Sequence, residues 1–459
     1  MATSAISSLG IGSSGVLSQS VIDQLRSADE SAVIKPITTK ITQNTTKTND
    51  LAKLTTLTAT LKADTSTLSD ETTYLKNSVT SSSSNITVSA ESGVPSQDFS
   101  IDVTKIAKQD IYQSKSFTNA TDTFTGANDT LNFNIAGKDY TVDVTPTMSL
   151  SNLKDKIYDA TAGKITASIL NVGGSNPYKM TLKSTDTGSD NAITFTSTGG
   201  GTAVTDLGFD NVANHIQPAA NAEFTYNNVA ISRQSNNISD LIVGVTLNIN
   251  DVGQSNISIK QDTSSISDSI TSFVKDYNSL MSSLDSSTSY DPTTKTAGIF
   301  QGTSEVRDLK AALSRQLSSV NSQGKSLSDY GVSLNSAGLL EINQDTLNSN
   351  LSSNLSGVED FFRGNSTTNT TGYFTDFNSL LSSYTDTTTG ILTQLNTQFD
   401  TQATSLANEK QKATDSLDSK YSALTSKFIA YDSMISQMNS SFQSLNMQIQ
   451  SLTNSSSKS

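Results

Sequence analysis

The strongest periodic pattern in the chain is LDSKYSALTSKFIAYDSMISQMNSSFQSLNMQIQSL, residues 417–452. Apolar residues recur there at alternating intervals of four and three, and no Gly or Pro interrupts them. They are Leu417, Tyr421, Leu424, Phe428, Tyr431, Ile435, Met438, Phe442, Leu445, Ile449 and Leu452. This spacing is typical of a coiled-coil seam. It predicts one continuous helix from about residue 404 to about residue 453, roughly 75 Å long at ~1.5 Å per residue.

A seam of this length needs a partner, because each apolar side chain left in water forgoes about 1.5–3 kcal/mol of burial free energy. A second seven-residue repeat lies near the other end of the chain, preceded by Ile34, Ile37 and Ile41. Its members are Leu51, Leu54, Leu61, Leu68 and Leu75. We expect the two ends to pair as one helical stalk. Two alternatives stay open: an amphipathic helix on a globular core for the first repeat, and an intramolecular bundle for the last heptads.

The middle of the chain, residues 79–262, alternates apolar and polar residues with a period of two, which predicts β-hairpins. Examples are Phe99, Ile101 and Val103, and later Leu131, Phe133 and Ile135. Asn227 and Asn228 are typical of a tight turn. One short helix is expected around Leu150, Leu153 and Ile157, capped by Ser149 or Ser151. We therefore expect two small β-rich domains, one inserted in the other.

The predicted fold class is α+β and multidomain, with a coiled-coil or helical-bundle stalk built from both chain ends and an inserted β-rich head. Further helices are expected after residue 263, and a small hairpin at residues 332–342. The predicted domains are terminal helices that are disordered in the monomer (1–40 and 432–459), a helical-bundle leg domain (41–78 and 263–431), a β-rich head domain (79–115 and 219–262) and an inserted outer head domain (116–218). The weakly apolar terminal segments are expected to fold on assembly.

The composition excludes several classes of function. The net charge of −13 argues against nucleic acid and against an anionic membrane surface as partners. The chain has no cysteine and one histidine, so disulfides and thiolate chemistry are excluded and zinc lacks its usual ligands. No apolar stretch reaches the ~20 residues of a membrane span. The first twenty residues do not resemble a general secretory signal peptide, so we expect another export route.

No catalytic constellation is found in the sequence. His215 is the only histidine and is interpreted as a surface-loop residue between residues 210 and 218. Asp186, Asp190 and Asn191 offer side-chain oxygens to a calcium ion, but the segment TDTGSDN lacks the regular oxygen ligands and terminal Glu of a calcium loop. A solvated turn is the preferred interpretation. We expect no enzyme activity, no cofactor and no metal site.

The N-terminal segment ISSLGIGSSGVLSQSVIDQL, residues 6–25, resembles the opening of the flagellar cap protein family, also called hook-associated protein 2. Leu9, Gly10, Ile11, Gly12 and Ser13 match, whereas Ser14 interrupts the family's run before Gly15. The segment FVKDYNSLMSSLDSSTSYDPTTKTAGIFQGTSEVRDLKAAL, residues 273–313, carries the family's Tyr-Asn-x-Leu, Tyr-Asp and Gly-x-x-x-Gly elements. Similar segments are residues 168–195, 223–249, 331–347 and 427–445, so the resemblance spans nearly the whole chain.

This resemblance implies a homo-oligomeric ring at the distal end of the bacterial flagellar filament. Exported flagellin would fold beneath the ring and insert into the filament without leaking away. It also implies secretion through the flagellar type III export channel with an export chaperone bound near the C-terminus. The residues expected to make subunit or filament contacts are Leu9, Ile11, Ile22, Leu25, Phe428, Tyr431, Ile435, Met438, Phe442, Leu445 and Ile449. The alternatives are an adhesin of the flagellar tip that binds mucus or host-cell glycans, and another hook–filament junction protein.

Overall fold

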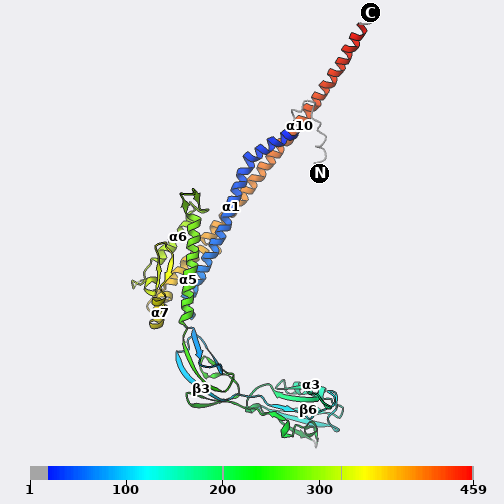
Figure 1. Cartoon of the computed structure of the whole chain (residues 1–459), viewed down its shortest axis with the longest axis vertical. Helices are drawn as coiled ribbons and strands as arrows, with labels where there is room; N and C mark the ends of the chain where they lie inside the picture. Colours follow the sequence, from blue (N-terminus) through cyan, green and yellow to red (C-terminus); the bar gives the residue numbers. More distant parts are fainter. Residues whose placement is uncertain (1–18, 199–200, 322, 457–459) are drawn as a thin grey trace. The chain divides into compact units, whose positions relative to one another are not determined.

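The computed structural model describes residues 19–198, 201–321 and 323–456 (Figure 1). The chain divides into two compact units. The helical unit combines the N-terminal part of the chain up to Asp70 with everything from Ser267 onward, and the β-rich unit comprises Glu71–Ile266. The fold class is the expected one, an α+β multidomain chain with long helices near both ends.

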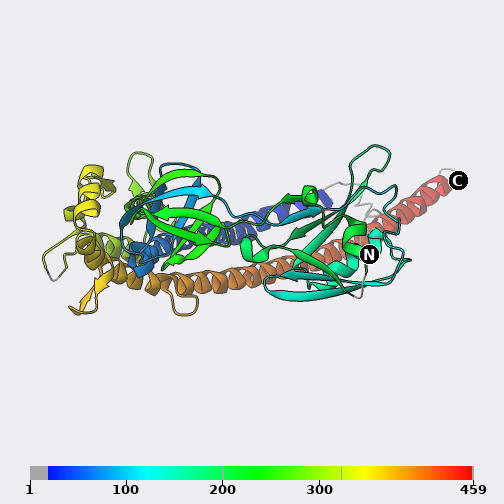
Figure 2. The ribbon, with the colours of Figure 1, turned by 90° about the horizontal axis from the view of Figure 1, so that it is seen from below.

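Two long helices dominate the helical unit: α1 (Gln19–Ser69) and α10 (Ile391–Ser456). They pack side by side, as both ribbon views show (Figures 1 and 2). At ~1.5 Å per residue, the 66 residues of α10 span about 100 Å. The predicted C-terminal helix is therefore confirmed. It begins earlier than expected because Leu392, Leu395 and Phe399 are buried in the bundle.

From Ile37 onward the buried residues of α1 recur at intervals of seven and then of three and four, as the repeat predicted. The buried residues of α1 are Ile22, Ile37, Asn44, Leu51, Leu54, Thr58, Leu61, Thr65 and Leu68. The inclusion of Leu75 in this repeat was wrong, because α1 ends at Ser69 and the short helix α2 (Glu71–Tyr74) precedes Leu75. Strand β1 (Asn77–Ser81) follows directly after Leu75 and Lys76. That strand begins before the predicted β region and was missed, because its residues are mostly polar.

The rest of the helical unit surrounds an aromatic core. Phe273 lies with its ring centroid 4.9 Å from Phe374 and 5.5 Å from Phe377, in edge-to-face geometry. Helices α7 and α8 were not singled out by the sequence pattern. The helices of this part are α5 (Thr263–Thr288), α6 (Ser304–Leu317), α7 (Gln344–Ser353), α8 (Leu355–Arg363) and α9 (Tyr373–Thr385). The hairpins are β16–β17 (Tyr290–Asp291, Thr296–Ala297), β18–β19 (Val332–Leu334, Leu340–Ile342) and β20–β21 (Gly364–Asn365, Thr370–Thr371).

The β-rich unit contains two hydrophobic cores, each enclosed by two antiparallel sheets. The first core lies between a five-stranded sheet of order β1-β15-β3-β11-β12 and a three-stranded sheet of order β13-β14-β2. Their strands are β2 (Ile86–Ala90), β3 (Gln97–Lys105), β11 (Ala222–Tyr226), β12 (Val229–Arg233), β13 (Asn237–Ile242), β14 (Val245–Ile249) and β15 (Gly253–Gln261). The expected tight turn is confirmed: Asn227 and Asn228 both have positive φ, and Tyr226 pairs with Val229.

The second core lies between the sheets β10-β4-β8-β7 and β6-β5-β9 and includes residues of helices α3 and α4. The elements are β4 (Ile111–Gln113), β5 (Asp129–Ile135), β6 (Lys138–Val144), α3 (Leu150–Ala160), β7 (Ile165–Asn171), β8 (Tyr178–Ser184), β9 (Thr194–Thr198), α4 (Ala203–Leu207) and β10 (His215–Gln217). The predicted short helix is confirmed as α3, since Ser149 caps it through the backbone N–H of Asn152. Finer domain boundaries within this unit stay a prediction.

Candidate functional site

A small apolar cluster joins the N-terminal part of α1 to α10. Ile22 is buried against Leu417 and Tyr421, with Leu424 and Phe428 half-buried beside them. A second point fixes the relative direction of the two helices: Asn44 Nδ2 donates to the backbone carbonyl of Phe399 at 2.9 Å. The two helices are therefore antiparallel. The Leu54–Leu68 repeat was expected to pair with the C-terminal seam, and this expectation was wrong. Because Asn44 lies opposite Phe399 and the helices are antiparallel, residues 54–68 extend past the position where α10 begins. They pack toward α9 instead.

Charged side chains flank this cluster and cross between the two helices. Lys420 Nζ lies 2.6 Å from Asp29 Oδ2, and the Tyr421 hydroxyl donates to the same oxygen at 2.8 Å. These hydrogen bonds hold the pKa of Asp29 below its usual range, and they raise the pKa of Lys420. Arg26 bridges Glu30 on its own helix and Asp418 on α10. Sequence analysis missed these residues, although opposite charges beside a seam are a usable signal for helix register.

Replacing Asp29 by Asn is expected to lower the melting temperature of the helical unit slightly at neutral pH. Asp29 has a lowered pKa in the folded chain, so its contribution is present above the ordinary carboxyl pKa and is lost as the pH falls below about 4. High salt should shrink the effect, because the pair is at the surface. Thermal unfolding at low and high salt tests this, with Asp415→Asn on the exposed face of α10 as control. In 1 M salt the Debye length is only about 3 Å, so the ion pair is screened. An equal loss of melting temperature at that salt concentration would show that the charge of Asp29 does not cause the destabilisation.

Beyond this cluster, α10 continues as a single long helix (Figure 1). Apolar side chains on this part of α10 are exposed. We call five of them the apolar stripe: Tyr431, Ile435, Met438, Phe442 and Leu445. Their side chains are between 41% and 64% exposed. Exposed apolar residues that follow a seam over several turns are typical of a surface that another helix covers.

The structure separates the predicted contact residues into four groups. Leu9 and Ile11 lie outside the described residues. Ile22 and Phe428 meet in the apolar cluster between α1 and α10. Leu25 is exposed on α1. The remaining residues are the stripe and Ile449, which is also exposed. Which of these residues contact another subunit or a filament stays a prediction.

The Tyr-Asn-x-Leu element quoted above has a structural role in the helical unit. The side-chain amide of Asn278 donates to the carbonyl of Leu340 at 2.9 Å and accepts from its backbone N–H at 2.7 Å. Asn278 thereby ties α5 to strand β19. In the Gly-x-x-x-Gly element, a Cβ on Gly298 would lie 2.4 Å from the backbone of Ser287, so a larger residue does not fit. These elements fix the fold rather than a reactive site.

The interpretation of His215 as a surface-loop residue was wrong. It begins strand β10, its Nε2 lies 2.6 Å from Asp110 Oδ1, and its ring stacks on Tyr112 at 4.0 Å. Asp110 is fully buried and also accepts backbone N–H groups from Ile193 and Ala219. Burial, and after it the negative charge of Asp110, raise the pKa of Tyr112. These hydrogen bonds tie β4 to β10 and to the segment before β9. His215 and Asp110 therefore stabilise the fold of this unit.

The polar side chains of the acidic turn at residues 186–191 have separate partners and are not gathered around one site. Asp186 pairs with Lys164 at 2.8 Å, and Asn191 donates to the backbone carbonyl of Thr187. Within the described ranges, no group of three or more His, Cys, Asp or Glu residues is placed to hold a metal ion. Among the described helices, none is both long enough and apolar enough to span a membrane.

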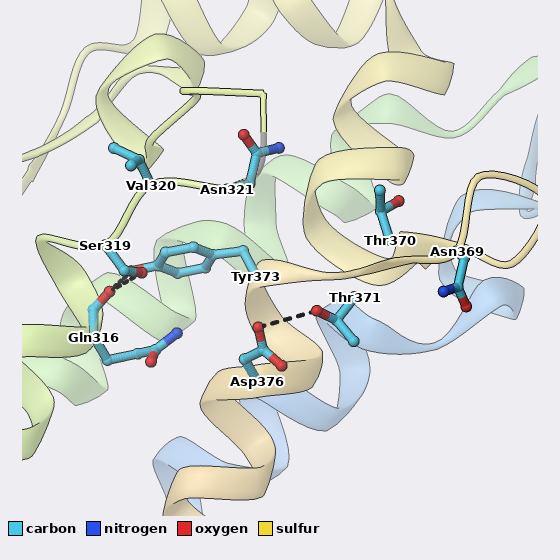
Figure 3. A pocket seen from close by; sticks show the side chains of 9 residues that line it. All are labelled: Gln316, Ser319, Val320, Asn321, Asn369, Thr370, Thr371, Tyr373 and Asp376. Carbon is cyan, nitrogen blue, oxygen red and sulfur yellow. Dashed lines mark hydrogen bonds between the residues drawn. The ribbon is translucent and has the colours of Figure 1, made fainter.

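One polar pocket of about 320 Å³ lies in the helical unit, between the end of α6, the β20–β21 hairpin and the start of α9 (Figure 3). The Tyr373 hydroxyl donates to the Gln316 carbonyl at 3.0 Å, and Thr371 donates to Asp376 at 3.4 Å (Figure 3). Burial raises the pKa of Tyr373, so this hydroxyl stays protonated. Asp376 is the only carboxylate among the nine described lining residues, which therefore do not form an acid–base pair.

Comparison with known proteins gives a consistent result. The model of the flagellar hook-associated protein 2 N-terminus matches residues 14–110, and that of its C-terminus matches residues 219–440. The flagellar hook-associated protein 2 of Campylobacter jejuni is 32% identical over 417 residues, which cover 79% of this chain and 65% of that protein. The chain thus spans slightly less than two thirds of that relative. The Escherichia coli K12 protein is 31% identical, over 90% of this chain and 92% of its own length.

A solved structure agrees with these matches. The D1-D2-D3 domains of the flagellar cap protein from Escherichia coli align with a TM-score of 0.60 and 30% sequence identity. The alignment covers 76% of this chain and 99% of the solved one. The similarity therefore extends over both the sequence and the fold.

Proposed function

The chain belongs to the flagellar hook-associated protein 2 family, and from this membership we propose that it forms the structural cap at the distal end of the flagellar filament. In this role it promotes the folding and insertion of exported flagellin and prevents flagellin from leaking into the medium. It acts by assembly rather than by catalysis, and its place is outside the cell, at the filament tip. The solved relative is described as a flagellar cap protein, which supports this proposal.

The observation that carries the proposal is the apolar stripe on α10. A helix that buries its seam as far as Phe428 and then exposes the same seam for several turns needs another surface. At about 1.5–3 kcal/mol for each buried side chain, covering the five residues offers a large driving force for association. Neighbouring copies of the chain, arranged as a ring, and the helices of the filament end are the surfaces we propose.

Two further partners follow from the proposed role. A subunit that reaches the filament tip passes through the flagellar export channel as an unfolded chain, which the absence of cysteine in the sequence favours because no disulfide has to be reduced. An export chaperone that covers the stripe before export would keep it from premature association. Binding of the β-rich unit to mucus or host-cell glycans stays a prediction. No feature of the described residues supports it.

Deletion of this chain from its own bacterium tests the proposed function. The expected result is loss of motility, short or absent filaments, and monomeric flagellin in the culture medium. Reintroducing the full chain should restore filaments, whereas a chain ending at residue 428 should be made but should not restore them. Filaments of normal length without the chain, and without free flagellin in the medium, would contradict the proposal.

A further inference from the structure

Two carboxylates from different helices face each other inside the helical unit. Asp64 lies on α1 and Asp276 on α5. They sit among fully buried apolar residues of both helices, such as Leu61, Leu68 and Phe273. Several other carboxylates of the unit pair with lysine or arginine instead, as Asp285 does with Lys310.

One oxygen of Asp64, Oδ2, is buried and accepts no hydrogen bond from any described residue. Its neighbour is the side chain of Asp276, which is within hydrogen-bonding reach. Two ionised carboxylates offer only acceptors to each other, so neither can satisfy the other. If one of them is protonated, its O–H can donate to an oxygen of the other. A shared proton would therefore supply the hydrogen bond that the ionised pair lacks.

The charges around Asp64 do not supply an alternative partner. Among the described groups, Asp276 is the only one whose charge acts on Asp64. Lys62, two residues earlier on α1, acts instead on Asp386 after α9. Lys310 of α6 pairs with Asp285 of α5, and Asp376 of α9 accepts from Thr371. In the part of the chain that the structure describes, no lysine or arginine acts on the Asp64 carboxylate.

We propose that Asp64 and Asp276 share one proton in the folded helical unit, and that this shared proton makes the contact between α1 and α5 sensitive to pH near neutrality. In mildly acidic solution the pair is a hydrogen bond between the two helices. Above neutrality the pair is two like charges in a half-buried site, and the contact is weaker. This inference goes beyond the proposed function and does not depend on it.

The direction of the effect follows from proton linkage. Burial first, and then the charge and hydrogen bond of Asp276, raise the pKa of Asp64 to about 6. In the unfolded chain the carboxyl has its ordinary, lower pKa, so the folded state binds the proton more tightly. The contribution to stability is fully present below the ordinary pKa and is lost as the pH rises through about 6.

The variant Asp64→Asn is the sharpest test, because an amide has the shape of a carboxyl group and donates to Asp276 at every pH. Thermal unfolding of the full chain is followed by the helical circular-dichroism signal between about pH 5 and about pH 8. The melting temperature of the natural chain should fall as the pH rises through about 6. Asp64→Asn should raise the melting temperature at the alkaline end by about 2–4 °C and flatten its dependence on pH.

Two controls and one direct measurement accompany this variant. Asp276→Asn should reproduce the flattening from the other helix, whereas Asp415→Asn on the exposed face of α10 should leave the dependence unchanged. An NMR titration of the Asp64 carboxyl carbon in the natural chain should show a midpoint near 6. An ordinary carboxyl midpoint, or an Asp64→Asn chain that keeps the pH dependence of the natural chain, would overturn the proposal.

Discussion

The triple variant Ile435→Glu, Met438→Glu and Phe442→Glu is expected to weaken self-association of the full chain at least 100-fold and to abolish flagellin capping. Each of the three side chains forfeits about 1.5–3 kcal/mol if the stripe is buried in the assembly. Every 1.4 kcal/mol is about a tenfold change in an equilibrium constant, so even a partial loss exceeds two orders of magnitude. The fold should survive, because all three side chains are exposed. Analytical ultracentrifugation measures the association, and flagellin in the medium reports on capping.

A matched control uses the opposite face of the same helix. The variant Ser433→Glu, Ser440→Glu and Ser444→Glu adds the same three negative charges to α10, at positions about 200° away from the stripe at ~100° per residue. It should associate and cap nearly as the natural chain does. If both variants lose association equally, net charge and not the stripe is responsible. If neither does, the stripe is not the contact surface.

The sequence predicted the two long helices well because their apolar spacing is a local property. Alternating intervals of three and four over eleven positions need a helix, and α10 forms one. The axial register of α1 against α10 was not predictable from that pattern, since a repeat of similar apolar residues fits at many offsets. Polar contacts fix the register instead. The Asn44 amide donates a hydrogen bond to the Phe399 carbonyl. Asp29 forms an ion pair with Lys420 and accepts a hydrogen bond from the Tyr421 hydroxyl.

The errors in the β-rich unit have a related cause. Strand β1 is mostly polar, and its place is set by residue-by-residue pairing with β15, more than 170 positions later in the chain. The loop prediction for His215 follows from its sequence neighbours, which are mostly polar. Its actual surroundings, Asp110 and Tyr112, are about a hundred residues earlier in the chain. A sequence pattern within a short stretch of the chain does not reveal contact partners that lie a hundred or more residues away. The candidate surface on α10 was predictable because its defining feature, an apolar seam, lies within a single helix.

Replacing Phe273 by Ala is expected to destabilise the helical unit by about 3–5 kcal/mol, the usual cost of a large buried aromatic side chain. Phe273 is fully buried and meets Phe374 and Phe377 edge to face, so its loss leaves a cavity and removes both ring contacts. Denaturant unfolding measures the change. Hydrogen exchange should locate it in α5 and α9, with strand β3 in the other unit far less affected.

The matched control is Phe442→Ala, the same chemical change at a side chain that is 64% exposed. It should leave the unfolding free energy of the monomer nearly unchanged and should weaken self-association instead. The two variants thus separate the two uses of apolar surface in this chain, since Phe273 maintains the fold and Phe442 lies on the proposed contact. A stability loss at Phe442 comparable to that at Phe273 would mean that the stripe is already buried within the monomer. In that case the stripe is part of the monomer's own core and is not open to a neighbouring subunit.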